Sequence, residues 1–371
     1  MSKFYRILYI EGNGNLAGGG QISLLKLLKK LNREKFEPVV ICPFKGNLTS
    51  RLESIGIKTI IIPMNPPKKN LFSFIFSIKK LRSLFLKLKV NLVHANTSRS
   101  ALYGGLAARP LGIPVIWHVR VIESEGLYDR FLVSLCTKLI TVSMAVQKRF
   151  DWLLKKHPEK IAVIHNGVDL QEFNPEINGN DVREEFDIPL DIPVAGVLGN
   201  LIPWKGQKYF IQAAVEVIKT VPAARFLVVG DGECRKKLES LTEKLGLKGK
   251  IIFTGRRFDI PRIIAAMDVV VNSSISPEPF ARVVIESMAT GKPVVAMNEG
   301  GVPEVIEDSV SGILIPPKNS SLMAQAIIDL FNDKEKARKI GLTARKNVEK
   351  KFSIEENVKK TEEVYLKILN A

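Results

Sequence analysis

Short apolar runs alternate with longer amphipathic stretches along the first 170 residues of the chain. Each run has the length of a buried strand, and the stretches between several of them, such as 22–31, repeat apolar residues at helical spacing. The predicted strands are Ile7–Ile10, Pro38–Cys42, Thr59–Ile62, Val90–His94, Val115–His118, Leu139–Ser143 and Ala162–Ile164. Strands that alternate with helices form a parallel sheet covered on both faces, so we predict a doubly wound α/β domain.

The alternation stops at residues 171–193, which are polar, contain three prolines and are predicted as a linker. A second series of strands is predicted at Val194–Leu198, Arg225–Val229, Lys250–Phe253, Val269–Asn272, Pro293–Ala296 and Gly312–Ile315. We therefore expect an α/β chain with two Rossmann-like domains, 1–175 and 190–352. The segment 353–371, with a helix at about 354–369, can belong to either domain. Ligands of such sheets bind beyond the carboxyl ends of the strands, so two such edges facing each other would form a cleft.

Length and composition agree with two soluble domains. The chain has 371 residues, 46% of them apolar and 25% charged. No apolar run reaches the roughly 18 residues of a membrane-spanning helix, and the first run lacks the cleavage site of a signal peptide. The three cysteines, Cys42, Cys136 and Cys234, are far apart and indicate free thiols in a reducing compartment. We predict a cytoplasmic protein.

The charge is concentrated in the first half. Residues 1–170 hold 27 Lys and Arg against 10 Asp and Glu, a net charge of +17, whereas residues 171–371 hold 28 of each kind. Such an asymmetry favours an anionic partner for the first half, either nucleic acid, an anionic membrane or a phosphorylated substrate. A surface charge that only keeps the protein soluble is the alternative.

A basic and aromatic helix is predicted at residues 71–89. One helical stripe is apolar: Leu71, Phe74, Ile75, Ile78, Leu81, Phe85 and Leu88. Three further apolar residues lie off that stripe, among several cations: Phe72, Phe76 and Leu86. An apolar face bordered by lysines is typical of a helix that rests on an anionic bilayer, so we predict peripheral membrane contact.

Three segments carry candidate chemistry. EGNGNLAGGG leads from the first strand into a helix near Gln21, and such a turn aims free N–H groups at negative charge, although it matches no standard nucleotide motif. Lys205, in GNLIPWKGQ, opens a helix where its ammonium can neutralise a phosphate. Glu278 and Glu286 stand eight residues apart in SPEPFARVVIE, where Pro279 is expected to begin a helix.

The spacing of the two glutamates argues against a hydrolase. Eight helical residues rise about 12 Å. The carboxyl groups of glycosidases lie roughly 5–5.5 Å apart in retaining enzymes and roughly 6.5–9.5 Å apart in inverting ones. Two carboxylates at the larger spacing can instead hold hydroxyls at the two ends of one ligand, with helix N–H groups for a diphosphate between them. That is the shape of a nucleotide sugar.

A set of motifs in the same order resembles family four of the retaining glycosyltransferases, which have the GT-B fold. The resemblance runs over nearly the whole chain. Its motifs are GGGQ, LVHANTS, PVIWHV, ITVS, IHNGVDLQEF, GNLIPWKGQ, VVGDGE, FTG, EPFARVVIE and GGVPEVI, of which the E-x7-E spacing of Glu278 and Glu286 is the most specific. The family implies an acceptor mainly on the first domain and a nucleotide-sugar donor mainly on the second.

The resemblance also implies roles for residues. Glu278 matches the glutamate that contacts the transferred sugar, and His118 matches a first-domain histidine near that sugar. Glu286 matches the glutamate that binds the ribose hydroxyls, and Lys205 matches the lysine that binds the diphosphate. The remaining donor-binding positions are Gly18 and Gly19 in a loop over the donor, Phe280, Ala281, Arg282 and Val283 along the phosphates, and Arg256 and Arg257 near the base.

The chain departs from the family at several of these positions. Asn200 stands where an arginine that binds phosphate is usual, so Arg256, Arg257 or Arg282 is expected to supply that charge. Ala281 replaces a usual glycine, and Gln21 stands where an acidic residue is frequent. Arg120 stands where an aspartate is common and suits an anionic acceptor. Arg120 and Asn96 are therefore the predicted residues on the acceptor side.

The expected reaction transfers a sugar from a UDP- or GDP-sugar to an acceptor hydroxyl with retention. No residue is a convincing covalent nucleophile, and no Asp-x-Asp motif occurs, so neither a metal nor another cofactor is required. The basic first domain favours a glycan or lipid-linked acceptor, in polysaccharide or glycolipid synthesis at the inner membrane face. The alternatives are an inactive partner subunit that binds nucleotide sugar and a GT-B epimerase. Nucleic acid is not expected, because no motif for it is visible.

Overall fold

The computed structural model describes residues 4–66 and 68–370. They belong to two compact units. Unit 1 consists of Met1–Gly167 and Ile354–Ala371, and unit 2 is the intervening segment Val168–Ser353. The chain thus leaves unit 1 once and returns to it with its last helix.

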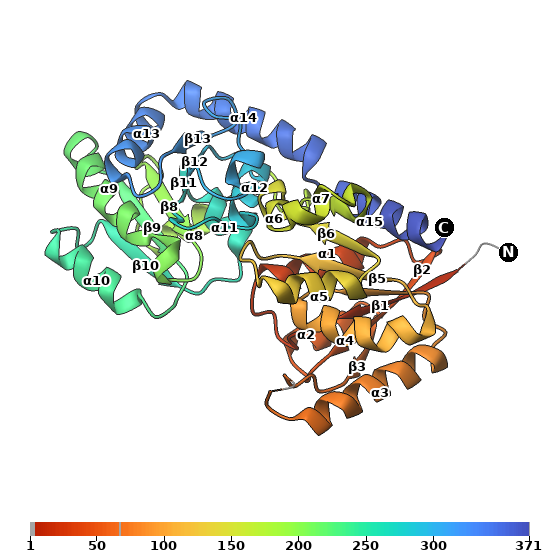
Figure 1. Ribbon diagram of the computed structural model, residues 1–371. Coiled ribbons are helices and arrows are strands. Elements are labelled where there is room, and N and C mark those ends of the chain that lie inside the picture. The colour runs from red at the N-terminus through yellow and green to blue at the C-terminus, as the bar shows by residue number, and fades with distance from the viewer. Residues whose placement is uncertain (1–3, 67, 371) are drawn as a thin grey trace. The chain divides into compact units, whose positions relative to one another are not determined.

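Unit 1 is built on a parallel sheet of seven strands in the order β3-β2-β1-β4-β5-β6-β7 (Figure 1). The strands are β1 (Tyr5–Ile10), β2 (Phe36–Cys42), β3 (Lys58–Ile61), β4 (Leu92–Ala95), β5 (Val115–Val119), β6 (Lys138–Thr141) and β7 (Ile161–Val163). The seven strands predicted for this part are confirmed, with ends that differ by one or two residues. Because the order reverses between β1 and β4, these adjacent strands form the switch point at which doubly wound sheets bind ligands.

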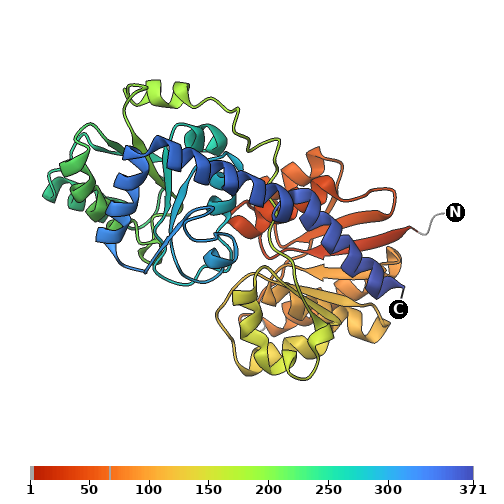
Figure 2. The same cartoon turned by 90° about the horizontal axis from the view of Figure 1, so that it is seen from above.

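The helices of unit 1 cover both faces of this sheet. They are α1 (Gly19–Lys30), α2 (Asn47–Ser54), α3 (Leu71–Lys87), α4 (Ser98–Ala108), α5 (Leu127–Leu135), α6 (Met144–Gln147), α7 (Asp151–Leu154) and α15 (Ile354–Leu369). On one face, apolar residues of α1, α2 and α15 share a core with β1 and β2. On the other face, α4 contacts β4 and β5 and lies between α3 and α5. Figure 2 shows α15, in dark blue, lying against the red elements that begin the chain.

Unit 2 repeats this plan with six parallel strands in the order β10-β9-β8-β11-β12-β13. The strands are β8 (Val194–Leu198), β9 (Arg225–Val229), β10 (Ile251–Gly255), β11 (Val269–Asn272), β12 (Val294–Met297) and β13 (Ile313–Ile315). The predicted strands are again confirmed. The order reverses between β8 and β11, which are paired, so the second switch point lies there.

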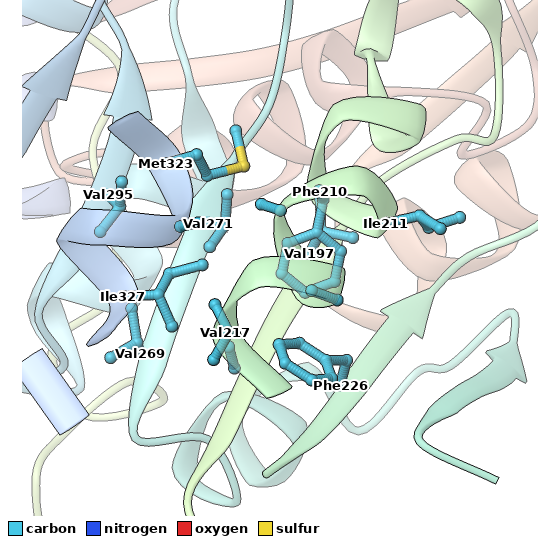
Figure 3. Close-up of a cluster of buried hydrophobic side chains, with 14 of the residues drawn as sticks. Val197, Phe210, Ile211, Val217, Phe226, Val269, Val271, Val295, Met323 and Ile327 are labelled. Carbon is cyan, nitrogen blue, oxygen red and sulfur yellow. The ribbon is translucent and has the colours of Figure 1, made fainter. Parts of the chain in front are cut away.

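In unit 2, residues of α9 and α13 form a buried core with the strands of the sheet. The helices are α8 (Asn180–Glu185), α9 (Gln207–Thr220), α10 (Arg235–Lys244), α11 (Ile260–Ala265), α12 (Arg282–Ala289), α13 (Ser320–Asn332) and α14 (Lys334–Lys351). Figure 3 shows Phe210 of α9 and Ile327 of α13 over Val197 of β8 and its neighbours, all of them buried. On the opposite face α12 contacts β11, β12 and α14. The ends of β8 and β11 are therefore held in place from both sides.

The segment 171–193, predicted as a linker, is packed onto unit 2. Its short helix α8 presents Val182 and Arg183, which are both buried. The guanidinium of Arg183 donates to the carbonyl of Ala266 at 2.9 Å and to that of Ile192 at 2.8 Å, and it forms an ion pair with Asp268 at 2.9 Å. The linker prediction was wrong, because the polar composition of the segment does not reveal that Arg183 binds it to the rest of unit 2.

Helix α3 exposes part of its apolar stripe. Leu71 and Ile75, which belong to that stripe, are 58% and 43% exposed. The side that packs inward follows Ser77, Leu81 and Phe85, which are buried. Ser77 reaches inward because its hydroxyl donates to the carbonyl of Pro63 at 2.8 Å. The first turns of α3 therefore project their apolar residues into solvent.

Candidate functional site

In unit 2, an ion pair joins the two loops that follow the strands of the switch point. The loop after β8 ends in a short 3-10 turn, Pro203–Lys205, and the loop after β11 carries Glu278. The ammonium of Lys205 lies 2.7 Å from Oε1 of Glu278, and the side chains are 19% and 7% exposed. The two residues are 73 positions apart, and the sheet order brings them together.

Glu278 is bound from three directions. Besides Lys205, the amide of Asn272 donates to its Oε1 at 3.2 Å, and the hydroxyl of Ser274 donates to the same atom. Burial raises the pKa of this carboxyl, but the charge of Lys205 and the three donors outweigh burial and hold the pKa below its usual range. Glu278 is therefore an ionised carboxylate with little exposed surface.

Two glycines allow the loops around Glu278 to come together. Gly206 follows Lys205 with φ +65°, and a Cβ there would lie 2.1 Å from the carbonyl oxygen of Ser273. Gly300 has φ +60°, and a Cβ there would lie 2.3 Å from the carbonyl oxygen of Glu278. Any side chain at either position would clash with this backbone, so the sequence needs glycine at both.

Glu286 forms a second pair with Arg282. The guanidinium of Arg282 donates to Oε1 of Glu286 at 2.5 Å, one helical turn away, and the side chains are 12% and 10% exposed. Helix α12 begins at Arg282, three residues after the predicted start at Pro279. The estimate of a 12 Å helical rise between Glu278 and Glu286 therefore does not hold, because four of the eight steps are not helical. The two glutamates are nevertheless both nearly buried.

The other residues predicted for donor binding differ in their surroundings. Arg257 is held by Asp259 at 2.7 Å and by Glu185. Asn200 and Arg256 are exposed. Phe280 and Ala281 are buried just before α12, and Val283 is half-buried on its first turn. Gly18 and Gly19 lie in unit 1, where Gly18 is the N-cap of α1. Because Arg257 and Arg282 have carboxylate partners, Arg256 is the most accessible of the three arginines considered in place of the missing one.

In unit 1, a cavity of about 230 Å³ lies at the other switch point. A cavity of roughly 150 Å³ can hold a benzene ring, so there is room here for a sugar ring or a similar group. Three predicted residues line it together: Asn96 after β4, and His118 and Arg120 at the end of β5. Glu11, Gly20 and Gln21 also line it.

Glu11 is a functional candidate that sequence reasoning missed. It is fully buried at the end of β1, where the amide of Gln21 donates to its Oε1 at 2.9 Å and the N–H of Gly12 donates at 2.8 Å. Burial raises its pKa despite these donors and the nearby Arg120. Its Oε2 has no hydrogen-bond partner among the described residues. The sequence feature that could have identified Glu11 is its position directly after the first predicted strand, at the start of a loop in which only the glycines were interpreted.

His118 is the second unusual group in the cavity. It is 2% exposed, its Nδ1 lies 3.1 Å from Nε2 of His94, and its Nε2 lacks a partner within the described chain. Burial, followed by the charge of Arg120, lowers its pKa well below the usual value. The side-chain amide of Asn96, also buried, has no described partner for either atom. The cavity thus presents buried polar groups suited to the hydroxyls of a ligand.

Within residues 4–66 and 68–370, no group of three or more His, Cys, Asp or Glu side chains could hold a metal ion. None of the described helices has the length and apolar character needed to cross a membrane.

Comparison with known proteins identifies the family. The sequence model described as "Glycosyltransferase Family 4" matches residues 17–172, and the model described as "Glycosyl transferases group 1" matches residues 180–347. The putative glycosyltransferase EpsD of Bacillus subtilis is 31% identical over 303 residues, which cover 77% of this chain and 79% of that relative. The chain belongs to glycosyltransferase family 4.

Two further relatives of this glycosyltransferase match it over nearly its whole length. The UDP-Gal:alpha-D-GlcNAc-diphosphoundecaprenol alpha-1,3-galactosyltransferase of Escherichia coli is 27% identical, with 97% of this chain and 96% of that relative covered. The crystal structure of Alr3699/HepE from Anabaena in complex with UDP-glucose has 27% identity and a TM-score of 0.84, covering 97% and 99% of the two chains. The predicted family and its GT-B fold of two Rossmann-like domains are confirmed.

Proposed function

We propose that this glycosyltransferase transfers a sugar from a UDP-sugar to a hydroxyl of a lipid-linked acceptor, with retention, at the inner face of a membrane. The observation that carries the proposal is the buried pair of Lys205 and Glu278 at the switch point of unit 2. It combines a cation suited to phosphate and an ionised carboxylate suited to a sugar, at the edge of the sheet where ligands bind.

The choice of UDP is supported by the relatives. The Escherichia coli relative is named for UDP-galactose, and the Anabaena protein was solved with UDP-glucose. Glu286, together with the first turn of α12, binds the ribose and phosphates in this proposal. Arg282 then serves two partners, because its guanidinium already donates to Glu286 and has further N–H groups for a phosphate oxygen.

When the donor binds, its diphosphate replaces Glu278 as the partner of Lys205. The ammonium of Lys205 can donate three hydrogen bonds and neutralise the charge that develops on the leaving group. Glu278 keeps Asn272 and Ser274 as donors and remains ionised. Its negative charge lies beside the transferred sugar, where it stabilises the positive character of the anomeric carbon as the bond to phosphate breaks.

Retention follows in this proposal from attack on the face that the diphosphate leaves. Asn272 and Ser274 continue to donate to one oxygen of Glu278, and in this proposal its charge stabilises the anomeric carbon electrostatically. The departing phosphate accepts the proton of the acceptor hydroxyl. The acceptor's polar groups bind in the cavity of unit 1, where Asn96 and Arg120 contribute and Arg120 suits a phosphorylated acceptor.

The lipid-linked acceptor and the membrane contact are supported by helix α3. Its exposed apolar residues include Phe72 at 88%, Phe76 at 68% and Leu86 at 61%. Exposed cations surround them, at positions 68, 69, 79, 80, 87 and 89, all of which are lysines. Large exposed phenylalanines beside lysines match the interface of an anionic bilayer, with the rings at the acyl boundary and the ammonium groups at the phosphates. The Escherichia coli relative, named for an undecaprenol-linked acceptor, points to the same substrate class.

The experiment that tests the proposal combines binding and turnover. Thermal unfolding of the purified protein is followed with a panel of UDP- and GDP-sugars, and the best donor is then incubated with undecaprenyl-diphosphate-linked N-acetylglucosamine as the probe acceptor. We expect stabilisation by a UDP-sugar and a product whose anomeric configuration, read by NMR, equals that of the donor. An inverted anomer would exclude retention, whereas free epimerised nucleotide sugar would favour an epimerase. Binding without hydrolysis or transfer would indicate an inactive partner subunit.

A further inference from the structure

Two buried polar side chains stand next to each other at the switch point of unit 1. Ile10, the last residue of β1, is paired with Ala95, the last residue of β4. Glu11 and Asn96 follow these two residues, and the N–H of Asn96 donates to the carbonyl of Ile10 at 3.1 Å. Neighbouring strands lie about 4.8 Å apart, and residues in register on parallel strands direct their side chains to the same side. Glu11 and Asn96 accordingly line the same cavity.

Three polar atoms of this pair have no hydrogen-bond partner among the described residues. They are Oε2 of Glu11 and both polar atoms of the Asn96 amide. The two residues are 0% and 3% exposed. A buried polar group without a partner costs free energy, and nearly all such groups in folded proteins are bonded. Because these atoms belong to side chains that line a cavity, a ligand in the cavity can complete their bonding.

The other oxygen of Glu11 holds the carboxyl group in place. The N–H of Gly12 donates to Oε1 at 2.8 Å, and the amide of Gln21 donates to the same atom at 2.9 Å. A Cβ on Gly12 would lie 3.2 Å from the side chain of Thr97, so the loops after β1 and β4 are in close contact. The protein thus orients the carboxyl group, and Oε2 is the oxygen left for a ligand.

A hydroxyl is the chemical group that fits both residues. A hydroxyl donates one hydrogen bond and also accepts, so it can bond to Oε2 of Glu11 whether the carboxyl group is ionised or protonated. It can likewise bond to either atom of the Asn96 amide, whichever way that amide is turned. An ionised phosphate oxygen can only accept and an ammonium can only donate, so neither suits every one of these atoms. Two hydroxyls, one for each residue, satisfy the pair.

We propose that Glu11 and Asn96 form a subsite that binds two hydroxyls of one sugar ring of the acceptor and so selects which sugar is accepted. The assignment to the acceptor rests on the proposed function, which places the acceptor in unit 1. The cavity, of about 230 Å³, has room for one ring. A site that bonds a substrate hydroxyl rejects an analogue without it, because its own buried polar groups are then left unpaired.

Acceptor kinetics test the pair, with undecaprenyl-diphosphate-linked N-acetylglucosamine as the probe. Asn96→Leu keeps the branching of the side chain without its polar atoms, and Glu11→Leu removes the carboxyl group. Each should raise KM for the acceptor about tenfold or more, as for the loss of one or two hydrogen bonds, with little change in KM for the UDP-sugar. Glu11→Gln keeps polar atoms at both positions and should recover most of the loss. An unchanged acceptor KM, or a rise in the donor KM alone, would overturn the proposal.

Asn357→Leu is the matched control. Asn357 is a buried asparagine on α15 of the same unit, and its amide donates to the carbonyl of His165 at 2.6 Å. The free energy of unfolding should fall in Asn357→Leu, which removes this bond, but not in Asn96→Leu, where the amide has no partner among the described residues. The acceptor KM should change in the opposite order. If Asn96→Leu is the more destabilised variant, Asn96 is a structural residue and the proposal is wrong.

Deoxy acceptors give a test that does not depend on the folding of any variant. Forms of the probe acceptor that lack one ring hydroxyl each are compared with the complete acceptor in the wild type. We expect kcat/KM to fall about tenfold for two of them. Asn96→Leu should no longer distinguish one of these two from the complete acceptor. If the wild type uses every deoxy form as well as the complete acceptor, the subsite does not exist, and the proposed transfer is unaffected.

Failure of the proposed function leaves the subsite testable. If the wild type transfers sugar from none of the UDP-sugars, saturation-transfer NMR with methyl N-acetylglucosaminide as the probe reads binding without turnover. Binding that Asn96→Leu loses and Asn357→Leu keeps would support the subsite while the proposed function is wrong. Absence of binding to the wild type, or equal binding to all three proteins, would overturn the subsite.

Discussion

Lys205 and Glu278 form a buried ion pair, 2.7 Å from Nζ to Oε1, across the switch point of the second sheet. Each residue follows a different strand, and each is held by a glycine whose Cβ would clash with the facing loop. In the absence of a ligand the pair satisfies both charges. In the proposed function the diphosphate competes for Lys205, so we expect substitution of either residue of the pair to affect transfer.

Replacing Glu278 tests its place at the reaction centre. Glu278→Gln keeps the shape but removes the charge beside the sugar, and we expect kcat to fall about 100-fold or more, as for the loss of an electrostatic stabiliser. UDP affinity should change little, since Lys205 gains freedom to bind phosphate. Turnover assays and calorimetry with UDP measure the two effects. The control Glu216→Gln removes an exposed carboxylate that is paired with Lys219, and equal losses in both variants would contradict the role.

Replacing Lys205 tests the pKa of Glu278. In the wild type the folded pKa of Glu278 is lowered, so its contribution to stability is present above the unfolded pKa and is lost as the pH falls through the folded value. In Lys205→Met the carboxylate loses its main cation, and burial raises the pKa. The variant should therefore be less stable than the wild type at pH 7 and should recover part of the difference as the pH falls toward 5. Denaturant unfolding at several pH values measures this, and a pH-independent difference would speak against the pairing.

Replacing Arg183 tests whether the segment 171–193 is part of unit 2. Arg183→Met leaves backbone carbonyls without their donor and removes the cationic partner of Asp268, which keeps the N–H of Val194. This should cost about 3 kcal/mol of unfolding free energy. Arg262→Met is the matched control, because Arg262 forms an exposed ion pair with Asp181 and should cost less than about 1 kcal/mol. Chemical denaturation compares the two. Similar small costs would mean that the segment contributes little to unit 2.

Replacing exposed phenylalanines tests the membrane surface of α3. Phe72→Ser combined with Phe76→Ser should weaken binding to vesicles containing phosphatidylglycerol by about tenfold or more, because burying one such ring is worth roughly 1.5–3 kcal/mol. Phe258→Ser is the control, since Phe258 is also 88% exposed but lies in unit 2. Flotation at low salt measures binding. If the wild type does not float with anionic vesicles, the membrane proposal is wrong. If the α3 variant and the Phe258→Ser control lose vesicle binding equally, α3 is not the membrane-binding surface.

The strands and the family could be predicted from the sequence because they depend on local pattern. Each strand is a short apolar run buried on both faces, and burial of both faces leaves a signal in consecutive residues. The start of α12 was misplaced for the same local reason. Pro279 favours a first helical turn, yet the chain stays non-helical until Arg282 while Glu278 pairs with Lys205 and its carbonyl accepts from the N–H of Gly301. Local propensity was overridden by contacts between distant loops.

The sequence alone determined the two parallel sheets and the membership of the family, and it supplied the residues of the proposed donor site. Only the tertiary structure decided which groups meet: Lys205 with Glu278, Arg183 with Asp268, and Tyr365 with His94 across 271 positions. The physical reason is that buried apolar residues recur along the chain with the period of the helix or strand to which they belong. A buried polar contact instead depends on strand order and on the return of α15 to unit 1, which no local pattern encodes.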